Sequence, residues 1–264
     1  MAGMTGNHAE NRSLAVFCDF ENVALGVREA KYAQFDMEKV LERLLLKGSI
    51  VVKKAYCDWE RYKEFKNAMH ASSFELIEIP HVRQSGKNSA DIRMVVDALD
   101  LCYTKAHVDT FVIVSGDSDF SPLVSKLREN AKTVIGVGVK NSSSDLLISN
   151  CDEFIYYDDL VRQDEQKRRA AKKRRDAAPA GEDKKQEAFD LFIGTLNALI
   201  GERGEGERIW GSMVKQALKR RKPGFNESYY GFKAFSDLVE DAAKKGLIQI
   251  EPDEKSGGYI IRPA

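Results

Sequence analysis

The chain has 264 residues, of which 43% are hydrophobic and 31% are charged, which predicts a soluble protein with one large domain and a smaller one. The 41 basic and 41 acidic side chains cancel, but they are unevenly placed, since residues 162–175 are strongly basic. Residues 1–13 lack the apolar core of a signal peptide, and no apolar run approaches the roughly 20 residues of a membrane span. We therefore expect a cytoplasmic protein that does not enter a membrane.

The cysteines are widely separated along the chain. Cys18, Cys57, Cys102 and Cys151 form no closely spaced pair and stand beside no histidine in a zinc-binding pattern. Their spacing favours reduced thiols over a disulfide framework or a zinc site.

Short apolar runs alternate with longer amphipathic segments from residue 14 to about 160. The predicted strands are 14–18, 49–56, 74–79, 110–115, 132–139 and 153–156. The predicted helices are 37–46 with Asp36 as the N-cap, 59–70, 88–103, and 121–129 with Ser121 as the N-cap and Pro122 at the first position. This alternation predicts an α/β domain with a mostly parallel sheet covered by helices on both faces.

The pattern stops at residue 161. Residues 161–185 are basic, then rich in Ala, Pro and Gly, without apolar periodicity, so we predict a basic linker whose first part can be helical. Residues 1–13 are predicted to be a disordered tail, which leaves 14–160 as the first domain.

A second pattern occupies residues 186–264. Apolar residues at helical spacing predict a helix that begins near Gln186, followed by helices at 209–219 and 227–245. Two short apolar runs, 247–251 and 259–262, flank a turn-rich loop and predict a hairpin. Three helices and a hairpin predict a small winged helix-turn-helix domain.

Acidic residues follow two of the predicted strands. Asp19 comes after the first strand, and Asp117 and Asp119 come after the fourth, while Asp91 lies near the start of the third helix. Carboxyl ends of parallel strands share one edge of the sheet, where such folds bind ligands, so these acids should converge. Converging carboxylates repel one another unless a cation lies among them, and Mg²⁺ or Mn²⁺ suits such oxygen ligands.

Asn22 stands three residues after Asp19 and can orient a water molecule or a phosphate. Two of the acids have alternative explanations. Asp119 can instead cap the helix that follows it, and Asp91 also suits the positive end of its helix. Asp19 and Asp117 are the strongest candidates.

The motifs Phe17-Cys-Asp-Phe-Glu-Asn22, Lys87-Asn-Ser-Ala-Asp91 with Asp97 following, and Ser115-Gly-Asp-Ser-Asp-Phe120 resemble the three signature blocks of the NYN domain. This is the LabA-like branch of the PIN-like nuclease superfamily. The resemblance covers residues 12–160 and implies a three-layer α/β/α fold with metal-dependent ribonuclease chemistry. It implies catalytic roles for Asp19, Asn22, Asp91, Asp117 and Asp119, with Asp19, Asp91 and Asp117 as metal ligands.

Two further positions extend this prediction. Lys87 lies in the loop before the third helix and can bind a phosphate as a point charge. Asp152 belongs to a loose late block of the family and either completes the acidic cluster or simply precedes a strand.

The segment from Trp210 to Phe235 resembles the OST-HTH, or LOTUS, domain, which implies RNA binding or docking of a protein partner. The end of the second helix in this domain is basic and suits phosphate contacts through Lys215, Lys219, Arg220, Arg221 and Lys222. Phe232 and Phe235 have the spacing of core residues. Tyr229 and Tyr230 can either stack on bases or pack against the wing.

These observations predict an endoribonuclease that uses Mg²⁺ or Mn²⁺ and recruits RNA through its second domain. The alternative is a non-catalytic regulator of RNA metabolism that binds RNA or a protein partner. PIN-like domains often self-associate, so homo-oligomerisation stays open.

Overall fold

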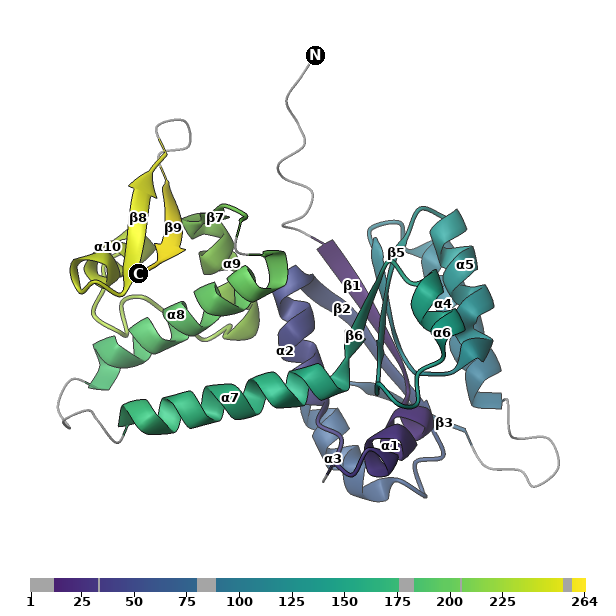
Figure 1. The fold of residues 1–264 in the computed structure, drawn as a ribbon. Helices are drawn as coiled ribbons and strands as arrows, with labels where there is room; N and C mark the ends of the chain where they lie inside the picture. The colour runs from purple at the N-terminus through teal and green to yellow at the C-terminus, as the bar shows by residue number, and fades with distance from the viewer. Residues whose placement is uncertain (1–11, 33, 80–88, 176–182, 205, 254–257) are drawn as a thin grey trace, which may run out of the picture. The chain divides into compact units, whose positions relative to one another are not determined.

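A computed structural model describes residues 12–32, 34–79, 89–175, 183–204, 206–253 and 258–264 (Figure 1). The chain divides into two compact units, one up to Ala170 and one from Ala171. Each unit has its own sheet. Among the described helices, none combines the length and the apolar character that a membrane span requires.

The first unit is built on a six-stranded parallel sheet with the strand order β3-β2-β1-β4-β5-β6. Its strands are β1 (Arg12–Asp19), β2 (Gly48–Cys57), β3 (Glu75–Glu78), β4 (Thr110–Val114), β5 (Thr133–Gly138) and β6 (Glu153–Tyr156). The chain moves outward from β1 through β2 to β3, then crosses back to place β4 on the other side of β1. The strand order therefore reverses between β1 and β4, where doubly wound sheets bind ligands.

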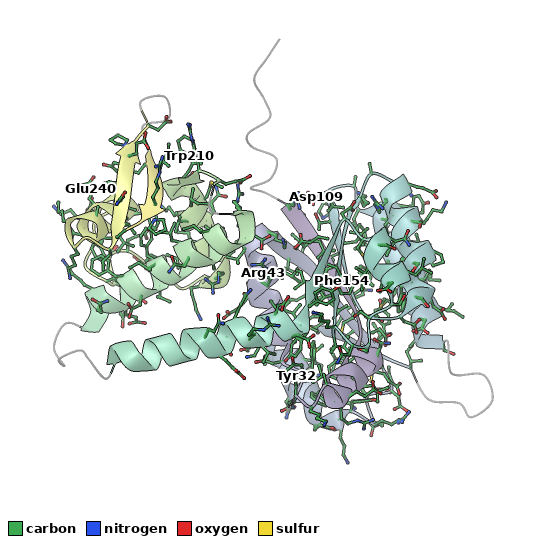
Figure 2. The ribbon with its side chains drawn as sticks, viewed as in Figure 1. Tyr32, Arg43, Asp109, Phe154, Trp210 and Glu240 are labelled. Atoms are coloured by element: carbon green, nitrogen blue, oxygen red, sulfur yellow. The ribbon has the colours of Figure 1, made fainter. Side chains whose placement is uncertain are left out.

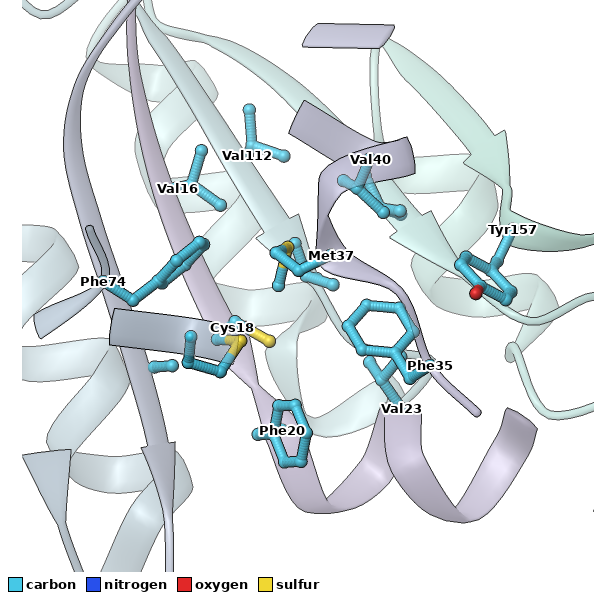
Figure 3. Close-up of a cluster of buried hydrophobic side chains, with 14 of the residues drawn as sticks. Val16, Cys18, Phe20, Val23, Phe35, Met37, Val40, Phe74, Val112 and Tyr157 are labelled. Atoms are coloured by element: carbon cyan, nitrogen blue, oxygen red, sulfur yellow. The ribbon is translucent and has the colours of Figure 1, made fainter. Parts of the chain in front are cut away.

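Helices cover both faces of this sheet (Figure 1). Their bounds are α1 (Phe20–Glu29), α2 (Met37–Lys47), α3 (Lys63–Ala71), α4 (Ser89–Thr104), α5 (Ser121–Glu129), α6 (Asp145–Asn150) and α7 (Tyr157–Arg175), with a 3₁₀ turn, η2 (Ser118–Phe120). Alternate residues of β1 point to opposite faces. Val16 and Cys18 pack with residues of α1, α2 and α3, as Figure 3 shows in part, whereas Ala15 and Phe17 pack with residues of α4, α5 and α6. The predicted three-layer α/β/α fold is confirmed.

Side-chain contacts attach the first helix to the end of the sheet. The Tyr32 hydroxyl, after α1, donates a 3.0 Å hydrogen bond to Asp158 in the first turn of α7 (Figure 2). Phe20 packs on Trp59 with a distance of 5.0 Å between ring centroids. Because Phe20 directly follows Asp19, this buried contact fixes the point at which β1 becomes α1.

All six predicted strands are present, with ends that differ from the prediction by at most two residues. Three features differ from the prediction. Helices α1 and α6 were not predicted, and α3 begins at Lys63 because residues after Trp59 form a turn. Ser121 is the first residue of α5 and not its N-cap, which is Phe120. The prediction for Ser121 was wrong: its hydroxyl is buried and has no hydrogen-bond partner.

The second unit has a three-stranded antiparallel sheet with the order β7-β9-β8. Its elements are α8 (Asp183–Arg203), β7 (Ile209–Trp210), α9 (Gly211–Arg221), α10 (Phe235–Lys244), β8 (Ile248–Pro252) and β9 (Tyr259–Pro263). This is the element order of the predicted winged helix-turn-helix. The predicted helix 227–245 was wrong in its first part, since turns occupy the chain up to Ala234.

Aromatic side chains form the core of this unit. Phe189 and Phe192 of α8 make edge contacts with Phe232 and Phe235, at 5.7 and 5.8 Å between ring centroids. Both Phe232 and Phe235 are buried, as their spacing predicted.

The first part of the predicted linker is helical, because α7 continues to Arg175.

Candidate active site

Asp19 lies at the carboxyl end of β1, where its side chain is 7% exposed. One carboxylate oxygen accepts a 3.3 Å hydrogen bond from the Asn22 backbone N–H and so caps α1. The other accepts a 3.0 Å hydrogen bond from the Ser115 hydroxyl, which follows β4. Asp19 therefore connects the two neighbouring strands at the point where the strand order reverses.

The segment after β4 is fixed by a second set of hydrogen bonds. Gly116 donates its N–H to the Asn22 side-chain oxygen at 2.9 Å, and Asp117 donates its N–H to the Ser115 hydroxyl at 3.2 Å. An ideal Cβ on Gly116 would stand 2.4 Å from the backbone oxygen of Ser142, so only glycine fits here. These contacts place Asp117 next to the buried Asp19.

Asp117 and not Asp119 acts as the local cap. The Asp117 carboxylate accepts a 3.0 Å hydrogen bond from the Asp119 N–H and caps the turn η2, while the N-cap of α5 makes no side-chain capping bond. The capping alternative for Asp119 is therefore wrong. The Asp119 side chain is exposed, and its charge is among those that raise the pKa of Asp91.

Four carboxylates from three parts of the chain influence one another at this edge. Burial, followed by the charge of Asp91, raises the pKa of Asp19 to about 7, although the hydrogen bonds from Asn22 and Ser115 oppose this rise. Burial and then the charges of Asp117 and Asp119 raise the pKa of Asp91, in the first turn of α4, to about 6. The acids that the sequence predicted to converge thus lie within electrostatic range of one another.

Glu21 is a further acid of this group that sequence reasoning missed. Its charge also raises the pKa of Asp91, and its carboxylate lies 3.4 Å from the Arg61 guanidinium. The signal was its position two residues after Asp19, but helix α1, in whose first turn Glu21 lies, was not predicted.

The donors of this group suit a hard divalent cation. Carboxylate and amide oxygens are preferred by Mg²⁺, which binds one or two carboxylates and retains several waters. Within the described residues, no three acidic, histidine or cysteine side chains are arranged to hold a metal ion as they stand. The side chains therefore fit the chemistry of such a cation, but they do not form a complete set of ligands.

Two other acids quoted with the family blocks do not join the group. Asp152 accepts a hydrogen bond from the Val134 N–H at 2.8 Å and pairs with Arg128 at 3.0 Å. Val134 lies near the amino end of β5, at the opposite edge of the sheet, so Asp152 precedes a strand and does not complete the cluster. Asp97 accepts a 2.8 Å hydrogen bond from the Tyr56 hydroxyl and lies 3.0 Å from Arg93. Lys87 lies outside the described residues.

A hollow of about 470 Å³ opens beside Asp119. Its lining consists mainly of hydroxyl, amide and small apolar groups, from Ser118, Asp119, Ser121, Pro122, Ser125, Leu146 and Asn150.

The predicted basic residues of the second unit have different surroundings. Lys219 and Lys222 are exposed, as phosphate contacts require. Lys215 lies 3.6 Å from Glu227, and the Arg221 guanidinium donates a 3.2 Å hydrogen bond to the buried Thr195 hydroxyl. Arg221 therefore has a structural contact within the unit. Arg220 belongs to the last turn of α9.

A parallel sheet with a carboxylate cluster at its switch point defines an α/β domain of the PIN-like type. The chain belongs to the NYN domain family, which matches residues 13–158.

Relatives of the chain include an uncharacterized protein of Methanocaldococcus jannaschii, 29% identical over 47% of this chain and 49% of its own length. Meiosis regulator and mRNA stability factor 1 of Xenopus tropicalis is 27% identical over 60% of this chain and 9% of its own length. The chain thus spans at most about half the length of these curated relatives. A crystal structure of a Vibrio parahaemolyticus protein of unknown function is similar at a TM-score of 0.51 and 28% identity, covering 60% of this chain and 98% of that one.

Proposed function

We propose that this protein is a metal-dependent endoribonuclease whose active site is the acidic edge of the first unit. The observation that carries the proposal is the convergence of Asp19, Asp91, Asp117 and Asp119 in a domain of the NYN family. The name of one relative, a meiosis regulator and mRNA stability factor, agrees with RNA as the substrate.

In this proposal Asp19, Asp91 and Asp117 hold Mg²⁺ or Mn²⁺, and Asn22 and Asp119 orient the reacting groups. A metal ion bound here would activate water and stabilise negative charge on the phosphodiester. Ser115 keeps the Asp19 carboxylate in a fixed orientation through their hydrogen bond. Binding of the metal then requires Asp19 and Asp91 to be ionised, so it should weaken as the pH falls through their raised pKa values of about 7 and about 6.

The second unit has the proposed role of recruiting RNA, as a LOTUS-type domain. The exposed Lys219 and Lys222 suit contacts with the phosphate backbone, which weaken as salt increases. Reversing both charges is expected to weaken RNA binding and to reduce its salt dependence, without affecting metal binding. Unchanged affinity in a gel-shift titration would favour docking of a protein partner instead.

The direct test is cleavage of a mixed RNA pool by the purified protein with Mg²⁺, Mn²⁺ or EDTA. Asp117→Asn is expected to abolish cleavage, whereas Asp100→Asn, an exposed acid on α4, serves as the matched control and should leave it unchanged. Cleavage that survives Asp117→Asn, or cleavage absent with every metal, overturns the catalytic proposal.

RNA binding without cleavage is the second candidate function. It is favoured by one observation, that the described residues hold no preassembled group of three metal ligands. Metal-independent RNA binding together with a lack of cleavage would support it.

A further inference from the structure

Tyr229 is an exposed aromatic side chain in a fixed setting. It is 59% exposed, and its ring stands perpendicular to Tyr230, with 5.0 Å between ring centroids. Tyr230 in turn stacks on the buried Phe225 at 5.1 Å, and its hydroxyl donates a hydrogen bond to Glu187 of α8. The Tyr229 ring is therefore supported by packed neighbours while more than half of its surface faces solvent.

Lysine side chains border this ring. The Lys184 ammonium lies 4.6 Å from the centroid of the Tyr229 ring, and the Lys185 ammonium lies 5.1 Å from that of Phe232. Lys222 and Lys233 are exposed on the segments that lead into and out of the tyrosine pair. An aromatic ring flanked by cations matches a nucleic-acid strand, in which unpaired bases alternate with phosphates.

The surroundings of Tyr229 bear on the two expectations from the sequence. Its ring has Tyr230 as an aromatic neighbour and the Lys184 ammonium as a cationic one. The wing tyrosine, Tyr259, donates its hydroxyl to Glu240 of α10. Because Tyr229 is more than half exposed, burial does not explain an aromatic residue at this position.

We propose that Tyr229 stacks on an unpaired base, with Lys184 contacting the adjacent phosphate, so that the second unit selects single-stranded RNA. The inference rests on the proposed recruitment of RNA by this unit and adds the form of RNA that is bound. In a duplex both faces of each base are covered by neighbouring bases, so a stacking site of this kind rejects paired RNA. Two acidic side chains of this unit already have partners. Glu187 accepts a hydrogen bond from the Tyr230 hydroxyl, and the half-buried Glu227 pairs with Lys215.

The test measures binding of a fluorescein-labelled single-stranded RNA by anisotropy, using the full chain with Asp117→Asn and EDTA so that cleavage does not interfere. Tyr229→Ala is expected to weaken binding by about 5-fold to about 150-fold, the range found for the loss of one stacked base. Tyr229→Phe keeps the ring and should bind as the parent does. Lys184→Ala should reduce the salt dependence of binding.

Tyr103→Ala is the matched control, because Tyr103 is 65% exposed and lies on α4 of the first unit. A duplex of the same sequence should bind equally to the parent and to Tyr229→Ala. The inference is overturned if Tyr229→Ala leaves single-strand affinity unchanged, if it weakens duplex binding as much, or if the chain binds no RNA. Loss of single-strand affinity in a protein that cuts no RNA would support the inference while refuting the proposed nuclease.

Discussion

Replacing Asp19 by asparagine is expected to stabilise the metal-free first unit at neutral and alkaline pH, although it removes a residue of the proposed active site. The reason is the buried negative charge. Asp19 is 7% exposed, lies near Asp91, and has a serine hydroxyl and a backbone N–H as its hydrogen-bond donors. Asparagine has the same shape and keeps an oxygen for the N–H of Asn22, but it carries no charge.

The pKa of Asp19 gives the size and the sign of the effect. Its value of about 7 in the folded chain, against an ordinary 3.8, corresponds to about 4 kcal/mol at 1.36 kcal/mol per pKa unit. Between these values the folded state binds more protons than the unfolded state, so the free energy of unfolding falls as the pH rises. Rearranging the Ser115 hydrogen bond costs about 1–2 kcal/mol, which leaves a net gain of about 2–3 kcal/mol.

The assay is urea unfolding in EDTA, followed by the fluorescence of Trp59. Trp59 is buried in the first unit, and Trp210 is the other tryptophan of the chain, so a Trp210→Phe background restricts the signal to the first unit. The Asp19→Asn variant should be more stable than its parent at about pH 8, and the difference should be smaller at about pH 4.5, where the carboxyl of the folded parent is protonated and carries no charge.

Addition of Mn²⁺ should reverse the order, because a bound ion stabilises only the protein that holds it. At a metal concentration about 1,000 times the dissociation constant the parent gains about 4.1 kcal/mol, which exceeds the difference of about 2–3 kcal/mol, and the variant should gain much less. The reasoning is refuted if Asp19→Asn is less stable than its parent at about pH 8 in EDTA, or if Mn²⁺ stabilises both proteins equally.

Three further predictions concern residues of the first unit that hold its backbone or its acidic side chains in place. Gly116→Ala should destabilise the first unit by about 1–3 kcal/mol in thermal unfolding, because the Cβ meets the Ser142 backbone oxygen, whereas Gly194→Ala, in open space on α8, should be neutral or stabilising. Ser115→Ala removes a hydrogen bond that lowers the pKa of Asp19, so calorimetric titration should show Mn²⁺ binding moved to higher pH; an unchanged pH dependence would contradict this. Tyr56→Phe leaves the Asp97 carboxylate without its buried donor and should cost about 1–3 kcal/mol in urea unfolding, while Tyr103→Phe, at the surface, should cost less than about 0.5 kcal/mol.

Much of the first unit could be predicted because its sequence pattern is strong. Strands buried on both faces appear as continuous apolar runs, such as Phe111–Val114, and the alternation with amphipathic helices determines a parallel sheet. The convergence of Asp19 and Asp117 followed from this topology alone. Helix α1 was missed because its apolar positions, Phe20, Val23 and Val27, follow a motif that was interpreted for its chemistry.

Other features depend on contacts that a sequence does not contain. Asp117 and Asp119 have the same residue type in the same turn, and only the N–H groups that they meet decide which one is the cap. In the second unit, Lys219 and Arg221 belong to the same basic run. Burial of Thr195 on another helix explains why Arg221 turns inward while Lys219 stays exposed.

The side chain of Asn22 has a consequence for what the proposed site can recognise. Its oxygen accepts the N–H of Gly116, which orients the amide and uses one of the two lone pairs of that oxygen, while its NH₂ group can only donate. A donor of this kind suits a phosphate oxygen and not a cation. Asn22 would then contact a phosphate of the substrate. Its hydrogen bond with Gly116 also links the ends of β1 and β4, so a shift of the loop after β4 would move Asn22 as well.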